Sequence, residues 1–195
     1  MPEFMPPYIR LRPGVDVMGL LGQAAPADAS PSADIFMTDD PAPIVRRRPD
    51  GRLEMIEARW GVPFIDVGAL ARRRWPGPRN RCIVPFSAFG VLEVGAARSL
   101  GRDVFAPLRG RVGFLAGVCR PDGRRVRSMG GDSEGLDVFG LVSGEGAAAV
   151  GPFGHAPAPL FLVDAEEARL WLTAPWTIVK NLGRRRPIAL APAEI

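Results

Sequence analysis

The amino-acid sequence predicts an α+β protein in which curved, mostly antiparallel sheets predominate and a few helices flank them. Short segments rich in β-branched and aromatic residues alternate with turns rich in proline and glycine, which is the pattern of strands. The most apolar of these segments is 81–95, which we interpret as two short strands joined at a bend, because Pro85 and Gly90 interrupt the pairing ladder. In contrast, the segment that starts at Asp164 with Glu167 three residues later has the capping pattern of a helix that runs to about Thr173.

The other elements follow from the same patterns. A short helix is expected at 15–21, with Val15, Met18 and Leu21 on one side. Residues 42–45 and 53–60 read as a strand pair, since the turn between them has proline first and glycine at its exit. A short helix or loop at 65–71 follows. The remaining strands are expected at 104–105, 111–119, 136–143, 159–163 and 187–190, and the buried core at Trp60, Cys82, Phe89, Phe114 and Leu115.

Length and composition favour one folded domain. The chain has 195 residues, of which 47% are hydrophobic, and we expect a single domain over 5–195 with 1–4 as an extension or cloning remnant. Cys82 and Cys119 are isolated in apolar segments, so we expect buried free thiols rather than a disulfide or a metal site. No cofactor is indicated. No signal peptide or membrane-length apolar run is present, and we therefore expect a cytoplasmic protein. The sequence leaves the oligomeric state open, with a monomer as the default.

The charge of the chain is unevenly distributed. Residues 1–45 carry six acidic and two basic side chains, a balance of −4, so the net charge of +4 leaves +8 on the remainder. Lys180 is the only lysine, and arginine is well suited to bidentate phosphate contacts. Two interpretations stay open: a nucleic-acid-binding surface, or an ordinary solvated surface in a protein from a GC-rich genome.

Several segments occur in the order and spacing of a known family. The residues are RCIVPFSAF at 81–89, PAPIVR at 41–46, ARWGVP at 58–63, FLAGV at 114–118, GHAPAPLFL at 154–162 and ARLWL at 168–172. Together they resemble the SRAP (SOS response-associated peptidase) family, whose members crosslink to abasic sites in single-stranded DNA. The resemblance covers most of the chain from about Met5 onward, and it also implies a β-rich fold with a positively charged DNA channel.

The resemblance implies chemistry that this chain largely lacks. Family members use an N-terminal cysteine, an asparagine, a glutamate and a histidine, which form and reverse a Schiff base by acid–base catalysis. Here the cysteine position falls on Pro6 and the glutamate position on Val91, and the asparagine segment is shortened beyond alignment. His155 is retained, and Glu93 is the one carboxylate near the lost glutamate. Ser87 has no nucleophile motif around it, so we interpret it as structural.

The sequence therefore leads to three hypotheses of different classes. The first is non-covalent binding of single-stranded or damaged DNA by a basic rim with an aromatic residue for stacking. Its residues are Arg72, Arg73, Arg74, Trp75, Arg79 and Arg81. The second is an enzyme of altered chemistry, a lyase or peptidase, that uses His155, Glu93 and a processed Pro6 amine. The third is an interaction protein without a ligand.

Overall fold

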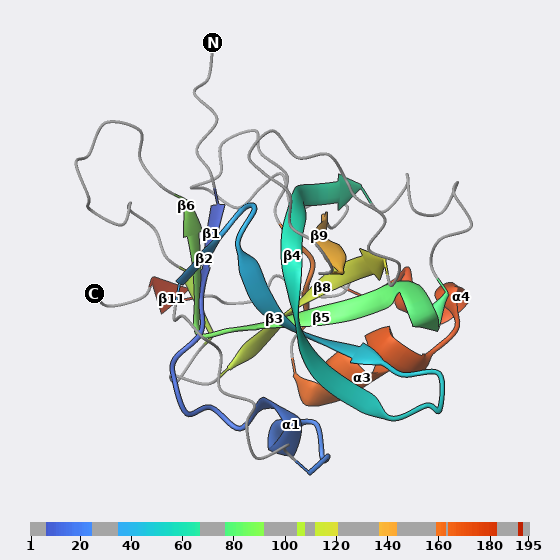
Figure 1. Ribbon diagram of the computed structural model, residues 1–195. Coiled ribbons are helices and arrows are strands. Elements are labelled where there is room, and N and C mark those ends of the chain that lie inside the picture. Colours follow the sequence, from blue (N-terminus) through green and yellow to red (C-terminus); the bar gives the residue numbers. More distant parts are fainter. Residues whose placement is uncertain are drawn as a thin grey trace, which may run out of the picture.

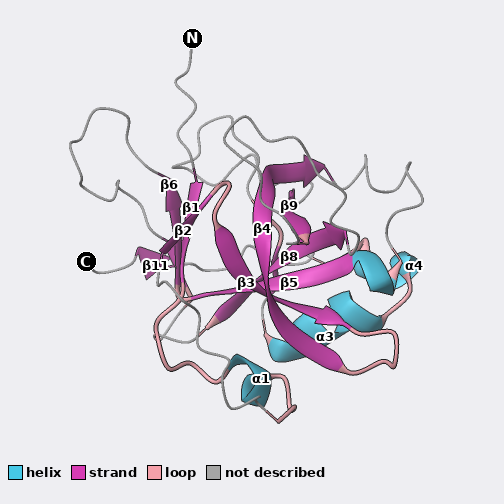
Figure 2. Ribbon diagram, viewed as in Figure 1, coloured by secondary structure: helices cyan, strands magenta, loops and turns pink. Residues whose placement is uncertain are grey.

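A computed structural model describes residues 7–24, 35–66, 77–91, 105–107, 112–120, 137–143, 159–162, 164–182 and 191–192. The protein is β-rich with few helices, which confirms the predicted fold class (Figures 1 and 2). Its strands are β1 (Pro7–Arg10), β2 (Ile35–Met37), β3 (Pro41–Arg47), β4 (Leu53–Asp66), β5 (Arg81–Phe86), β6 (Ala88–Val91), β7 (Phe105–Ala106), β8 (Gly113–Arg120), β9 (Val138–Ser143), β10 (Phe161–Leu162) and β11 (Ala191–Pro192). The helices are α1 (Val17–Leu20), the 3-10 helix η1 (Pro78–Asn80), α3 (Ala165–Thr173) and α4 (Trp176–Val179).

The larger sheet closes on itself. Its strand order is β10-β8-β5-β3-β4-β9, and β8 also pairs with β9, so the strands β8, β5, β3, β4 and β9 form a ring. All pairs in this ring are antiparallel except β4 with β9, which is parallel. Closure of a sheet removes the unpaired edges that otherwise invite association with other chains. The ring is the scaffold on which the helices and the second sheet are placed (Figure 1).

Alternation of side chains along these strands separates an inner from an outer face. Trp60 and Phe139 stack with ring centroids 6.2 Å apart, and both are buried in the same cluster as Cys82 and Leu115. Phe89 and Phe114 belong to this cluster too, which confirms the predicted core. Apolar residues from every strand of the ring thus form one continuous core.

The central segment 81–91 connects the two sheets. β5 belongs to the ring, and β6 belongs to a second sheet of order β11-β7-β6-β1-β2. The bend between them is Ser87, whose backbone N–H donates to the carbonyl of Arg10 (2.7 Å) and whose Oγ accepts from the N–H of Arg12 (3.1 Å). The two strands and the structural serine are confirmed, but Pro85 stays inside β5, opposite Phe114.

Helix α3 packs on the outside of the ring, against β5 and β8 (Figure 2). It begins as the capping pattern predicts, because Asp164 Oδ1 accepts the backbone N–H of Glu167 (2.8 Å). Trp171 is fully buried, and its Nε1 donates to the carbonyls of Cys82 (2.9 Å) and Gly117 (3.1 Å). This side chain therefore joins α3 to two neighbouring strands at one point.

Three boundaries differ from expectation. β4 continues to Asp66, beyond the predicted end at 60, because its second half pairs with β9. The expected helix or loop at 65–71 is therefore wrong for Ile65 and Asp66, and the rest of it lies outside the described residues. Helix α1 begins only at Val17, after Asp16, whose side chain accepts the N–H of Gly19. The expected strand at 187–190 also lies outside the described residues, and β11 begins at Ala191.

Candidate nucleic-acid interface

The two described members of the predicted basic rim have opposite environments. Arg79 is exposed on η1, whereas Arg81, two residues later, is fully buried. The other predicted site residues, Pro6, Arg72, Arg73, Arg74, Trp75, Glu93 and His155, lie outside the described residues.

The side chain of Arg81 bonds to the C-terminal end of α3, so the prediction that Arg81 belongs to the DNA-binding rim is wrong. Its Nη1 donates to the carbonyl of Trp171 (2.6 Å) and its Nη2 to the carbonyl of Ala174 (2.7 Å). The guanidinium also lies over the Trp171 ring, 5.6 Å from its centroid. Burial lowers the pKa of Arg81 to about 10, which leaves it charged at neutral pH. A side chain with both amino groups engaged inside the protein has no surface to offer a phosphate.

Proline explains why α3 needs this arginine. The carbonyl of Trp171 would normally accept the N–H of the residue four positions later, but that residue is Pro175, which has no N–H. The N–H of Ile178 bonds to the carbonyl of Pro175 and does not reach that of Ala174. Arginine is a suitable donor here because its fork reaches two acceptors at once and its charge favours the C-terminal end of a helix dipole.

The arginines of the β3–β4 hairpin are mostly paired with acidic side chains. Arg46 bonds to Glu54 (2.8 Å) and to Asp137, at one end of the ring interior. Arg48 lies 3.7 Å from Asp50 and 3.9 Å from Glu54. Their positive charge is therefore locally offset, and this cluster contributes less to a positive surface than its sequence indicates.

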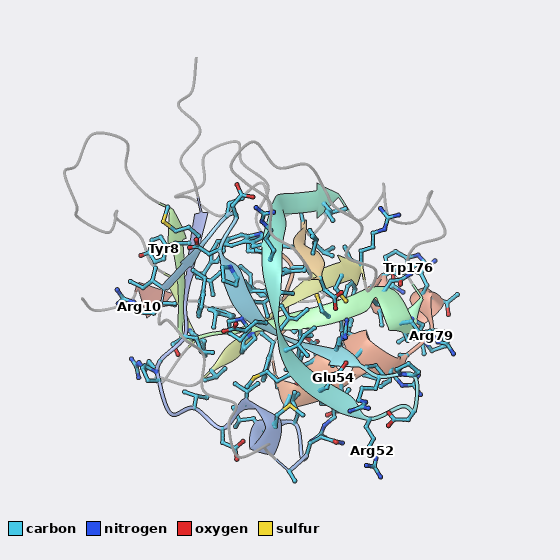
Figure 3. All side chains as sticks on the ribbon, viewed as in Figure 1. Tyr8, Arg10, Arg52, Glu54, Arg79 and Trp176 are labelled. Carbon is cyan, nitrogen blue, oxygen red and sulfur yellow. The ribbon has the colours of Figure 1, made fainter. Side chains whose placement is uncertain are left out.

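Five exposed cations have no ion pair with another described residue. Two of them lie elsewhere: Arg12 is on the β1–α1 connection, and Arg169 on α3 donates to the carbonyl of Leu21. The other three are Arg52 on the hairpin, Arg79 on η1 and Lys180 at the end of α4. Arg46 of β3 pairs with Cys82 of β5, and η1 directly precedes β5, so η1 adjoins the hairpin end of β3. Figure 3 shows Arg52, Arg79 and Trp176 on the side of the molecule where α4 lies. Arg52, Arg79 and Lys180 define what we call the η1–α4 surface.

Trp176 is the aromatic residue of this surface, and the sequence analysis did not select it. It is the first residue of α4, and it is partly exposed. Its ring meets the buried Trp171 edge-on, with centroids 6.4 Å apart and planes at 64°. The sequence pattern that could have selected Trp176 is its spacing of four residues from Lys180, which places the two side chains on neighbouring turns of a helix.

One position that the resemblance assigns to crosslinking, Val91, lies at the end of β6, an inner strand of the second sheet. Pro7, which follows Pro6, is the register partner of Val91, the position of the missing glutamate. Next to this pair, the ring of Tyr8 lies against Gly90, where an added Cβ would come within 2.7 Å of two ring carbons. Tyr8 is buried, its hydroxyl has no hydrogen-bond partner among the described residues, and burial raises its pKa. This end of the β1–β6 pair therefore carries the phenol of Tyr8, where the resemblance implies a thiol and a carboxylate.

Both cysteines are buried free thiols, as predicted. They lie on neighbouring strands, with Cys82 opposite Gly117 and Cys119 two residues further along β8. Burial raises the pKa of Cys82, and the hydrogen bond from the Cys82 thiol lowers the pKa of Cys119. An added Cβ at Gly117 would lie 2.8 Å from Cys82 Sγ, so glycine is needed there for space. The thiols are part of the core, on the opposite face of the ring from α3.

Comparison with known proteins supports the fold alone. No family model and no curated protein matches the chain. Among solved structures, a phage-related protein from Bordetella bronchiseptica aligns over 98% of this chain and 95% of its own, with a TM-score of 0.66 and 16% identity. A second B. bronchiseptica protein aligns over 96% and 99%, with a TM-score of 0.56 and 17% identity. A Bacteroides thetaiotaomicron protein aligns over 76% and 71%, with a TM-score of 0.51 and 16% identity.

Two general features concern the described residues only. None of their helices has the length and apolar character needed to cross a membrane. Within the same ranges, no three histidine, cysteine, aspartate or glutamate side chains gather as metal ligands would.

Proposed function

We propose that this chain is a divergent SRAP-like protein that binds single-stranded DNA without a covalent bond, through the η1–α4 surface. The observation that carries the proposal is the exposure of Arg52, Arg79 and Lys180 on that surface without ion-pair partners among the described residues. Cations of this kind bind a phosphate backbone and release its counterions.

Further cations lie nearby in the sequence. The run Arg72, Arg73, Arg74 ends three residues before Gly77, and the arginine run at 184–186 begins two residues after Leu182. Both runs lie outside the described residues. The described segments next to them in the chain, η1 and α4, both adjoin the C-terminal end of α3.

Salt dependence of binding tests the proposal. With three to five phosphates neutralised, log affinity for an oligothymidylate should fall against log salt with a slope of roughly −2 to −3.5, at about −0.7 per phosphate. Each of Arg79→Ala and Lys180→Ala should flatten the slope by about 0.7 and weaken all sequences alike. The control is Arg12→Ala, which removes the same charge from an exposed position on the β1–α1 connection and should leave the slope unchanged.

Two results would contradict the proposal. The first is binding that every charge-removing variant, Arg12→Ala included, weakens to the same small extent, as a merely solvated surface would give. The second is a denaturation-resistant adduct with abasic-site DNA, because Pro6 has no thiol and a thiazolidine ring is not expected. Such an adduct would favour the enzyme hypothesis, and its loss on replacing His155 or Glu93 would assign the chemistry.

A further inference from the structure

An exposed cation, Arg79, and a partly exposed aromatic ring, Trp176, lie on two segments that both adjoin the end of α3. Arg81 Nη2 bonds to the carbonyl of Ala174 at 2.7 Å, so the chain at η1 is held against the chain that leaves α3. Arg79 lies two residues before one partner of this bond, and Trp176 lies two residues after the other. The two residues therefore belong to segments that meet the same end of α3, although 97 positions separate them in the sequence, as 176 minus 79 shows.

Helix α4 presents Trp176 in a fixed orientation. Val179 is fully buried and anchors the helix, while Thr177 and Ile178 are exposed, Ile178 with 51% of its surface. The edge-on contact with the buried Trp171 orients the indole of Trp176, which is packed against the core and stays partly exposed. A ring that is already held by packing loses little rotational freedom when a flat ligand stacks on its exposed part.

The charges of Lys180 and Arg79 indicate which kind of flat ligand would bind to this surface. Lys180 follows Trp176 by one helical turn, its N–H bonding to the Trp176 carbonyl at 3.0 Å, and Arg79 is exposed on η1, which contacts α3. An aromatic ring with exposed cations on its own and on a neighbouring segment matches a nucleotide, whose base stacks while the phosphates on either side contact positive charge. Among the described residues of this surface, Ile178 is the exposed large apolar side chain that a protein partner would find, beside two cations without ion pairs.

We propose that Trp176 is the base-stacking residue of the single-stranded DNA site, with Arg79 and Lys180 holding the adjacent phosphates. Arg81 builds the site from inside, by holding η1 to the end of α3. This inference rests on the proposed function and adds to it the residue that contacts a base. It also changes the stacking assignment from Trp75, which the sequence favours, to Trp176.

Binding of an oligothymidylate of about 15 nucleotides, within the usual range of single-strand site sizes, tests the assignment. Trp176→Leu should weaken the affinity about 5- to 100-fold, the range expected for loss of one stacked base, and leave the salt slope unchanged. Trp176→Phe should restore most of the affinity because it keeps an aromatic face. Trp75→Leu is the matched control and should bind within about twofold of the wild type.

Fluorescence makes the test independent of the stability of the leucine variant. Trp60 and Trp171 are fully buried, so quenching by stacked DNA bases should come from an exposed tryptophan. The quenching should survive Trp75→Phe and disappear in Trp176→Phe while the latter still binds. Quenching that persists in Trp176→Phe, or wild-type affinity in Trp176→Leu, would overturn the assignment but not the proposed function. No salt-dependent binding by the wild type would overturn both.

Discussion

Replacement of Arg81 by methionine is the sharpest test of the architecture described above. Methionine keeps the length and most of the apolar volume of the arginine stem but removes every donor. The carbonyls of Trp171 and Ala174 then lose their partners, and Pro175 cannot replace them because it has no N–H. The variant therefore isolates the two hydrogen bonds from the packing around them.

The expected loss of stability follows from these two contacts. Each buried carbonyl left without a donor costs about 1–3 kcal/mol, which amounts to about 2–6 kcal/mol for the pair. Removal of a buried charge offsets part of this, because desolvation opposes the charged form, as the lowered pKa of Arg81 indicates. We expect a net loss of about 2–4 kcal/mol, a large part of the roughly 5–15 kcal/mol that stabilises a typical domain.

Urea unfolding measures this loss. With an m-value of about 2 kcal/mol/M, the midpoint should fall by about 1–2 M. Arg79→Met is the matched control: it makes the same substitution two residues away on an exposed side chain and should change stability by less than about 0.5 kcal/mol. Arg81→Lys should lie between the two, since one ammonium cannot reproduce a forked contact. An Arg81→Met variant as stable as the wild type would show that the cost of burying the charge equals the gain from its hydrogen bonds, and the reasoning would be wrong.

The remaining predictions concern the second sheet and the thiols. Gly90→Ala should cost about 1–3 kcal/mol, since its Cβ would meet the Tyr8 ring, whereas Gly77→Ala, with open space around the new Cβ, should be neutral in the same urea titration. An unfolded thiol titrates near pH 8.5, but burial raises the pKa of Cys82, so the unfolded chain loses its proton first. The free energy of unfolding should therefore fall as the pH rises above about 8.5, and Cys82→Ala should flatten that fall; an unchanged slope would contradict the raised pKa. Native-state alkylation followed by peptide mapping should label Cys119 before Cys82, because the pKa of Cys119 is lowered by its hydrogen bond with Cys82.

Much of the fold could be predicted because its signals are local. The turn from β3 to β4 is encoded by proline and glycine, and Gly51 has the positive φ of 90° that favours glycine. The cap of α3 depends on Asp164 and a backbone N–H three residues away. The nearly continuous apolar runs of β5 and β8 mark them as buried strands without knowledge of their partners.

These local sequence patterns could not predict that the larger sheet closes into a ring. The parallel pairing of β4 with β9 joins Arg59–Asp66 to Val138–Ser143, and no turn connects the two segments directly. Because parallel pairing leaves no short-range trace, the sequence analysis ended β4 too early. The same limit applies to the meeting of Pro7 with Val91, which only the pairing of β1 with β6 establishes.

The sequence was sufficient for the fold class, the order of most elements and the burial of both cysteines, because each depends on residues within a few positions of one another. It was not sufficient to tell Arg81 from Arg79, since two arginines that are two positions apart carry the same charge in the same sequence context. The acceptors of Arg81 lie 90 and 93 residues further along the chain, and they became available only when Pro175 left one carbonyl without a donor and α3 packed against β5. Long-range packing thus turned one arginine into a core residue and left the other exposed on η1.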